Sequence, residues 1–370
     1  MKVSIDVVIP SFRLDEKYIL PILRLRKPDN ALIRFYLVAD NPAIIPASSI
    51  QSLVDNEQVF LAVNPQNLGA SLTRNAGINM GSGEWVLLLD DDIAVSEDLL
   101  VTYANAALEH PEETGFIGLV RLPEPGTNFS AALKASGSLD IFSIAEHKPS
   151  FAWGATANIM VKRSAIGDVR FSTVYPKSGG GEDVDFFLKI REHNGYKDFK
   201  TLPQAAVVHP WWKNEQADLK RPFRYGKGNS WLPQLNPKYA YYDFPNTPET
   251  LLLSLLAAVI VLFVDPAWVI PVLLFMAGAV IIELIASSIQ TIKRARTGNI
   301  TVFVYVIALR LAQEAGVLWG KLSRFRFKGI GERFHDNGII NKVYFYRTNT
   351  YKIVKWILYP LLAFLILRAC

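Results

Sequence analysis

The chain has 370 residues, half of them hydrophobic, and a formal net charge of +5. This length exceeds what one compact core usually accommodates, so the sequence predicts at least two structural units. The single cysteine, Cys370, excludes an intramolecular disulfide and a cysteine-based metal site. Because the N-terminal stretch lacks the apolar core and cleavage site of a signal peptide, we expect the first unit to stay in the cytosol.

Short apolar runs with strand character recur through the first part of the chain, at residues 3–9, 33–39, 59–63, 85–89 and 116–120. Helix-like segments lie between most of them. This alternation predicts an α/β unit with a mostly parallel, Rossmann-like sheet. The usual glycine-rich signatures of dinucleotide and P-loop sites are missing from the sequence. Residues 121–150 have little pattern, and we expect a mobile connection over the site there.

Three consecutive acids, Asp90, Asp91 and Asp92, follow the apolar run "WVLLL". Adjacent carboxylates repel one another, so a chain that keeps them together is expected to supply a cation. Ligands of parallel sheets bind beyond the carboxyl ends of the strands, where these acids lie. Carboxylates are the ligands that Mg²⁺ and Mn²⁺ prefer. The alternative is an acidic loop that only leads into a helix capped by Ser96.

Three segments together resemble a known family. They are "VVIPSFR", "NLGASLTRNAGINMGSGEWVLLLDDD" and "GGGEDVDFFLKIREHNGY". In order and spacing they resemble the inverting family 2 glycosyltransferases of the GT-A fold, over roughly residues 3–230. The resemblance implies a GT-A nucleotide-sugar transferase domain over residues 1–235.

The resemblance also implies a metal site for Mn²⁺ or Mg²⁺. Asp90 and Asp92 match the two acids of the D-x-D motif, with Asp92 as the direct ligand and Asp90 nearer the ribose or a metal-bound water. Asp91 would belong to the donor site. His209 follows "AAVV" at the distance from the glycine-rich motif where family members place a metal-binding histidine. The alternative for His209 is a structural role among apolar residues.

Inversion requires a base that removes the proton of the attacking hydroxyl. By its match to the E-D motif, Asp183 would be that base, and Glu182 would orient the acceptor or its loop. The alternative is that Glu182, Asp183 and Asp185 only compensate the dipole at a helix N-terminus. That alternative leaves the three preceding glycines unexplained.

Further residues are assigned to the donor site with this resemblance: Pro10, Ser11, Arg13, Asp40, Asn67, Gly69, Arg74, Trp153 and Gly154. Trp153 is also a candidate platform for the acceptor, and the alternative for Arg74 is an arginine on a helix surface. The segment "RPFRYGKGNS" resembles, imperfectly, the Q-x-x-R-W motif of polymerising relatives. There Arg224 and Lys227 would clamp the diphosphate. Arg221 replaces the glutamine, which disfavours processive synthesis. The alternative is a basic loop beside lipid headgroups.

Residues 236–370 are predicted to form an all-α membrane region. We expect a helical hairpin at about 249–289, an amphipathic helix lying in the interface at about 300–320, and a last transmembrane helix at about 353–369. After residue 290 the sequence has fourteen basic residues and three acids. Such a basic flank is typical of the cytoplasmic side of a bilayer, and its apolar neighbours favour lipid over nucleic acid as the partner.

The sequence therefore predicts a multi-pass enzyme of the cell membrane with its catalytic domain on the cytoplasmic side. It would transfer a sugar from UDP, or alternatively from GDP or dTDP, to a hydroxyl of a lipid-linked or cell-envelope glycan. The alternatives are a polyprenyl-phosphate glycosyltransferase, a processive polysaccharide synthase and an inactive membrane scaffold. The glycine-preceded E-D motif favours a hydroxyl acceptor, because a phosphate acceptor needs no proton removed.

Overall fold

The computed structural model describes residues 2–340 and 349–369, and the chain divides into two compact units. The first unit comprises Met1–Glu124, Leu139–Asn214 and Asp336–Ile339. The second comprises Pro125–Ser138, Glu215–His335 and Ile340–Cys370.

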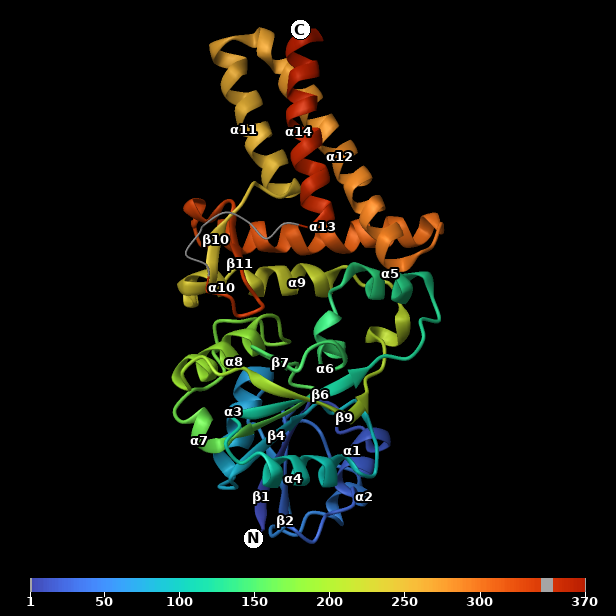
Figure 1. The fold of residues 1–370 in the computed structure, drawn as a ribbon, viewed down its shortest axis with the longest axis vertical. Coiled ribbons are helices and arrows are strands. Elements are labelled where there is room, and N and C mark those ends of the chain that lie inside the picture. Colours follow the sequence, from blue (N-terminus) through green and yellow to red (C-terminus); the bar gives the residue numbers. More distant parts are fainter. Residues whose placement is uncertain (1, 341–348, 370) are drawn as a thin grey trace. The chain divides into compact units, whose positions relative to one another are not determined.

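The first unit is built on a mixed sheet, which in the described part of the chain has nine strands in the order β3-β2-β1-β4-β8-β6-β9-β5, with β7 pairing β9 (Figure 1). The strands are β1 (Val3–Ser11), β2 (Ala31–Ala39), β3 (Val59–Val63), β4 (Trp85–Leu89), β5 (Ala94–Val95), β6 (Gly115–Arg121), β7 (Ser150–Phe151), β8 (Asn158–Lys162) and β9 (Phe199–Val208). Strands β3, β2, β1 and β4 are parallel neighbours. The predicted α/β class is confirmed, and all the predicted strands are present.

Helices cover both faces of this sheet: α1 (Glu16–Leu23), α2 (Ser48–Gln51), α3 (Ala70–Met80), α4 (Leu99–Glu109), α6 (Ile144–His147), α7 (Arg163–Ile166) and α8 (Glu182–His193). Alternate strand residues enter different cores, as the two-residue period of a strand requires. Val7 and Ile9 pack with α1, α2 and α4, whereas Val8 packs on the other face with α3, α7 and α8. Because both faces are covered, β4 is buried throughout.

The second unit is mainly helical, with a two-stranded sheet. Its elements are α5 (Asn128–Ser136), α9 (Lys220–Asn229), α10 (Leu232–Leu235), β10 (Ala240–Tyr242), α11 (Thr247–Val264), α12 (Val269–Ala295), α13 (Ile300–Leu322), β11 (Glu332–Phe334) and α14 (Thr350–Ala369). Four stretches of the described chain are long and apolar enough to cross a membrane: Thr247–Val264, Pro266–Ala295, Ile300–Leu322 and Thr350–Ala369.

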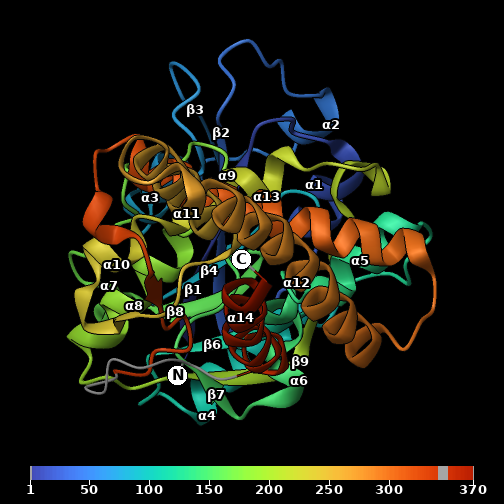
Figure 2. The same ribbon diagram turned by 90° about the horizontal axis from the view of Figure 1, so that it is seen from above.

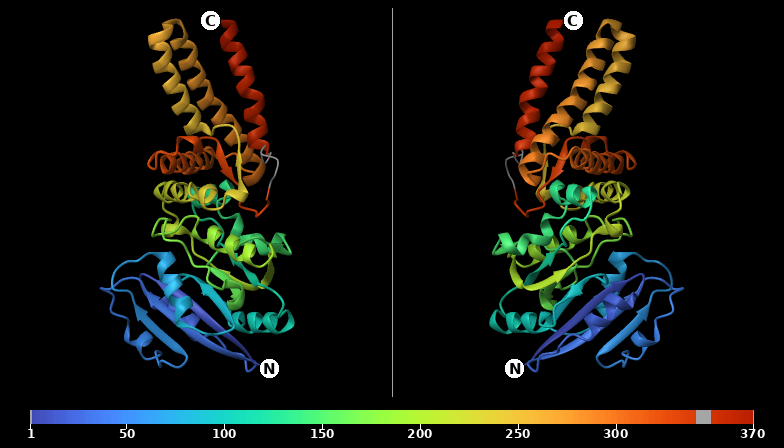
Figure 3. Two further views of the ribbon diagram at one scale, coloured as in Figure 1. Left: turned by 90° about the vertical axis from the view of Figure 1, so that its left-hand side faces the viewer. Right: turned by 90° about the vertical axis from the view of Figure 1, so that its right-hand side faces the viewer.

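Helix α13 lies crosswise to the other three long helices (Figures 1 and 3). The view from above shows α14 nearly end on (Figure 2). Helix α13 also contacts α9 at backbone distance, because a Cβ atom on Gly316 would lie 2.0 Å from the carbonyl oxygen of Phe223. Likewise, a Cβ atom on Gly226 would lie 2.0 Å from the carbonyl oxygen of Gln313. Only glycine permits this approach at either position.

A buried polar network joins three of the apolar helices. The carboxylate of Glu283 on α12 accepts hydrogen bonds from Thr247 (2.5 Å), Ser287 (2.6 Å), Tyr351 (2.5 Å) and Lys355 (3.1 Å). These residues come from α11, α12 and α14. Ionisable groups among apolar helices are costly unless paired, and here the charge of Glu283 is matched by that of Lys355.

The segment 121–150 corrects one expectation. Its weak sequence pattern predicts only a mobile connection, whereas the structure shows regular elements there: α5, α6, β7 and the 3₁₀ turn Asp140–Ser143. Helix α5 begins with a capping box between Thr127 and Ser130. Its buried Phe129, Ala132 and Leu133 have helical spacing, so the signal was in the sequence but spanned few residues.

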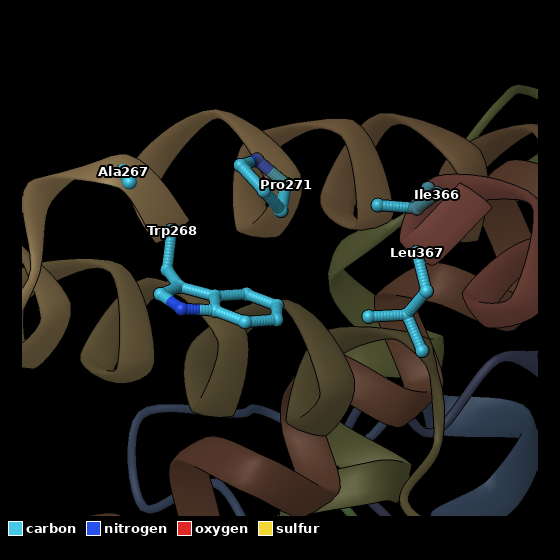
Figure 4. Close-up of a pocket in the computed structure, with 5 residues that line it drawn as sticks. All are labelled: Ala267, Trp268, Pro271, Ile366 and Leu367. Carbon is cyan, nitrogen blue, oxygen red and sulfur yellow. The ribbon is translucent and has the colours of Figure 1, made fainter. Parts of the chain in front are cut away.

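Figure 4 shows a small pocket between the turn that follows α11 and the C-terminal end of α14. It is lined by Ala267, Trp268, Pro271, Ile366 and Leu367. The indole N–H is the one side-chain hydrogen-bonding group in this lining, so the pocket lacks the charged partners that a nucleotide sugar requires.

Candidate active site

The carboxyl ends of β2, β1 and β4 bring the first candidate residues together. Ser11 is the last residue of β1, Asp40 follows β2, and Asp90 follows β4. Because these strands are parallel neighbours, their ends meet at one edge of the sheet.

Asp90, Asp92 and His209 form a cluster in which one ligand atom from each residue lies within 4.8 Å of the others. The pairing of β5 with β9 places His209, just after β9, beside the loop that carries Asp92. His209 Nε2 lies 3.4 Å from a carboxylate oxygen of Asp92. The ring Nδ1 of His209 lies 2.6 Å from the carbonyl oxygen of Pro210, an interaction that leaves Nε2 free to bind a metal. The two carboxylates suit Mn²⁺ or Mg²⁺, and the imidazole adds a nitrogen donor that a transition-metal ion such as Mn²⁺ accepts more readily than Mg²⁺ does.

The middle acid, Asp91, points to a different partner. It accepts a hydrogen bond from the hydroxyl of Ser11 at 2.5 Å. Burial, together with the neighbouring charge of Asp92, raises the pKa of Asp91 to about 6. Arg13 lies 3.2 Å from Asp92 and 3.7 Å from Asp91, and its side chain is 60% exposed. This exposed cation partly neutralises the acidic triplet and remains accessible to an anionic ligand.

The glycine run before the E-D motif has a backbone reason. Gly179, Gly180 and Gly181 have φ values of 87°, 133° and 93°, a conformation that side chains disfavour. This turn starts α8 at Glu182, so that Glu182 and Asp183 are its first two residues. A carboxylate oxygen of Glu182 also accepts a hydrogen bond from the Gly180 N–H at 2.5 Å.

Asp183 has the properties of a proton acceptor near neutral pH. Burial, followed by the charge of Glu182, raises the pKa of Asp183 to about 7. One of its oxygens accepts a hydrogen bond from the Val184 N–H at 2.9 Å. By contrast, Asp185 is fully buried and paired with Lys189 at 2.7 Å, which is a structural role.

Arg74 connects the two acidic motifs. Its guanidinium lies 3.1 Å from Asp90 and 3.4 Å from Glu182. Although burial disfavours the charged guanidinium, Asp90 and Glu182 raise the pKa of Arg74. Sequence analysis assigned Arg74 to the donor by resemblance, whereas in the structure its charge is matched by two acids of the site.

Asp40 holds a loop in place. Its carboxylate accepts hydrogen bonds, each of 2.8 Å, from the Asn64 side chain and from the N–H groups of Leu68 and Gly69. Gly69 has a φ of 88°, and a Cβ atom there would lie 2.7 Å from the Cα atom of Lys177. Asn67 is exposed on this loop. The loop therefore positions α3, on which Arg74 lies.

The remaining candidates are more dispersed. Pro10 lies within β1, opposite Val38 of β2. Trp153 is half-buried against the core on the α8 face. A Cβ atom on Gly154 would lie 2.9 Å from the Ile159 side chain, so core packing accounts for this glycine.

Two candidates belong to the second unit: Arg224 and Lys227 lie on α9. Within that unit the Arg224 guanidinium lies 5.5 Å from the centre of the Tyr225 ring. Lys227 is exposed.

Sequence analysis missed Tyr175, whose side chain is buried beside the acids of α8. Burial, then the charges of Asp185, Glu182 and Asp183, raise the pKa of its phenol. A lone tyrosine outside every motif gave no signal that could select it.

The model of the family described as "Glycosyl transferase family 2" matches residues 6–167. The chain is also similar to "Succinoglycan biosynthesis protein ExoM" from Rhizobium meliloti (strain 1021). The two are 30% identical over 236 residues, and the match covers 60% of this chain and 73% of that protein. The chain belongs to glycosyl transferase family 2. Its α/β unit is a GT-A domain, and apolar helices follow it.

Two solved structures have similar folds. One is a mannosyltransferase, PcManGT from Pyrobaculum calidifontis, in complex with GDP-Man and Mn²⁺ (16% identity, TM-score 0.49, 87% of this chain and 88% of that chain). The other is S. aureus TarS (17% identity, TM-score 0.41). That match covers 64% of this chain and 40% of the TarS chain.

Proposed function

We propose that this family 2 glycosyltransferase is metal-dependent and inverting, and that it moves a sugar from a nucleoside diphosphate, with UDP favoured, to a hydroxyl of a lipid-linked or cell-envelope glycan. One arrangement carries the proposal. The cluster of Asp90, Asp92 and His209 lies at the sheet edge, and Arg74 links Asp90 to the motif that contains the half-buried Asp183.

Asp90, Asp92 and His209 would hold a divalent cation, which when bound stabilises the negative charge that grows on the departing diphosphate. Arg13 adds an exposed positive charge beside the same acids. Ser11 holds Asp91 by a hydrogen bond, which keeps the acidic turn in one conformation. The loop fixed by Asp40 holds α3 in place.

Asp183 would take the proton of the attacking hydroxyl. A base works best when its pKa is near the operating pH, and the pKa of Asp183 is about 7. Glu182 would orient the acceptor beside Asp183, and its contacts with Arg74 and the Gly180 N–H support this role because they hold its carboxylate in place.

The membrane part of the proposal is a GT-A domain over residues 1–235 on the cytoplasmic side and a multi-pass region over residues 236–370. The four apolar helices support it, as does the basic flank after α12. The relative named for succinoglycan biosynthesis supports a cell-envelope glycan as the acceptor class. Helices α11, α12 and α14 would cross the bilayer while α13 lies in the interface.

Calorimetry on the full-length chain tests the donor and metal assignments together. UDP, GDP and dTDP are titrated separately with and without Mn²⁺. We expect UDP to bind in a Mn²⁺-dependent manner, and Asp92→Asn to weaken this binding by about tenfold or more. Asp98→Asn removes a nearby acid whose side chain is 67% exposed, and it serves as the matched control.

A transfer assay with UDP-sugars then tests the chemistry. We expect Asp183→Asn to retain nucleotide binding and to lose transfer, because it lacks the base. If the parent binds no nucleotide in the presence of Mn²⁺, or if Asp92→Asn and Asp183→Asn both behave like the parent, the proposed function is wrong.

A further inference from the structure

The turn that follows α13, Ser323–Gly329, exposes two large aromatic side chains. Phe325 is 82% exposed and Phe327 is 60% exposed, and Trp319 on the last turns of α13 is 55% exposed. Phe325 also has a φ of 56°, a left-handed conformation that bulky residues disfavour. The backbone is therefore strained at the residue whose ring is turned outward.

Basic residues alternate with these aromatic residues in the sequence "SRFRFKG". Arg326 is matched by Glu332 at 2.9 Å. Arg324 makes contacts with neutral groups: it donates to the carbonyl and hydroxyl of Ser230, each at 3.0 Å, and lies 3.8 Å from the centre of the Trp231 ring. Burial, then the charge of Arg326, lowers the pKa of Arg324. With Lys328 exposed, the turn carries an excess of positive charge.

Helix α13 exposes two further apolar side chains at its other, N-terminal end. Val304 is 57% exposed and Ile300 is 71% exposed. Aromatic rings beside basic groups are typical of segments at the boundary between acyl chains and headgroups. A basic residue near an anionic membrane surface contributes attraction that a neutral surface does not provide.

We propose that the turn Ser323–Gly329 is a binding site for anionic lipid headgroups, in which Phe325 and Phe327 enter the acyl boundary while Arg324 and Lys328 contact phosphate. This turn belongs to the second unit and the catalytic candidates Asp90, Asp92 and Asp183 to the first, and the inference does not depend on the proposed donor or acceptor. The alternation of aromatic and basic residues makes the turn selective for an anionic bilayer. The aromatic rings require the apolar acyl layer, and the basic groups require negatively charged headgroups next to that layer.

Site-specific quenching in nanodiscs tests the proposal on the full-length chain. Cys370→Ser removes the single cysteine, and Phe325→Cys then places one environment-sensitive fluorophore in the turn. Lipids carry a nitroxide either near the headgroup or at the end of the acyl chain. The matched control is Ile45→Cys in the same background, because Ile45 is 86% exposed in the first unit.

We expect the shallow nitroxide to quench the label at position 325 at least twofold more than the deep nitroxide does, with the label at position 45 unaffected. Adding phosphatidylglycerol to a phosphatidylcholine disc should strengthen quenching at position 325. A label that stays unquenched at position 325, as it does at position 45, would mean that the turn faces water or protein and would overturn the proposal.

Charge variants test the headgroup component separately. Arg324→Gln with Lys328→Gln should raise the phosphatidylglycerol content needed for half-maximal quenching, by up to about fivefold for each charge removed. Lys2→Gln with Arg24→Gln removes the same charge from exposed positions of the first unit and should have no effect. If quenching is equal with and without phosphatidylglycerol, and if neither double variant changes it, the proposed selectivity for anionic lipid is wrong.

Discussion

The guanidinium of Arg74 lies 3.4 Å from a carboxylate oxygen of Glu182, although the two residues are 108 positions apart in the sequence. Their side chains are only 8% and 7% exposed. Removing one partner of a buried ion pair leaves the other charge uncompensated, which costs roughly 3–5 kcal/mol. Arg74→Gln is therefore expected to lower the free energy of unfolding by roughly 3 kcal/mol, as measured by denaturant unfolding.

Arg74→Lys separates the charge of Arg74 from its geometry. A lysine keeps the positive charge but cannot bridge Asp90 and Glu182 with a planar fork. We expect it to recover part of the stability and little of the transfer activity, as measured by thermal unfolding and by kcat/KM. Equal losses of stability and activity in the two variants would show that the fork geometry is unimportant.

The raised pKa of Asp183 sets a pH dependence. Since a base must be ionised, we expect kcat/KM to rise with pH through about 7 and to fall about tenfold per pH unit below that value. Glu182 raises this pKa by its charge, so Glu182→Gln should move the acidic limb to lower pH. Initial rates of sugar transfer between pH 5 and pH 9 measure both curves. An acidic limb that does not move in Glu182→Gln would contradict the assignment of the limb to Asp183.

The same shift predicts an effect on stability. The folded pKa of Asp183, about 7, lies above its ordinary value of 3.8, so ionisation of this carboxyl disfavours the folded state increasingly from about pH 4 to pH 7. Asp183→Asn is therefore expected to unfold at a temperature at least as high as the parent at pH 8, while losing transfer. A strongly destabilised Asp183→Asn protein would contradict this prediction.

The arrangement of α13 predicts a membrane topology. If α11, α12 and α14 cross the bilayer and α13 lies in the interface, residues after α14 lie on the side opposite Lys293, Arg294 and Arg296. Basic residues favour the cytoplasmic side, so we expect a membrane-impermeant maleimide to label Cys370 in intact cells. Ile45→Cys with Cys370→Ser should react only after lysis. Labelling of Cys370 only after lysis would indicate that α13 crosses as well.

The Glu283 network predicts a compensating double variant. Glu283→Leu leaves Lys355 buried without its counter-charge and should lower the unfolding midpoint in detergent, with a cost of roughly 3 kcal/mol. Lys355→Leu should have a similar effect. Because the paired charges cancel, Glu283→Leu with Lys355→Leu is expected to recover much of the loss. Additive losses in the double variant would show that the two residues act independently.

Sequence reasoning reached those parts of the site that are local in the chain. The acids after β4 and the glycines before Glu182 could be read directly, because a strand end and a helix start each leave a short pattern. The contacts of Arg74 could not be read, since they depend on how α3 and α8 approach one another. The hydrogen bonds between Asp40 and the loop that begins at Asn64 could not be predicted either, because the two are more than twenty residues apart.

The helical unit shows the same limit. Hydropathy identifies the apolar helices, because their length and composition are continuous features of the chain. It does not reveal that Glu283 and Lys355, 72 residues apart, form one pair. Helix α5 was missed because its buried residues, from Phe129 to Ala135, span less than two turns.

The glycines at positions 226 and 316 have a mechanical consequence for the second unit. At Gly226 and Gly316 the backbones of α9 and α13 touch with no side chain between them, so we expect the two helices to move together. A displacement of α13 is therefore expected to carry α9 with it. Any residue larger than glycine at position 226 or 316 would push α9 and α13 apart and make their movements independent.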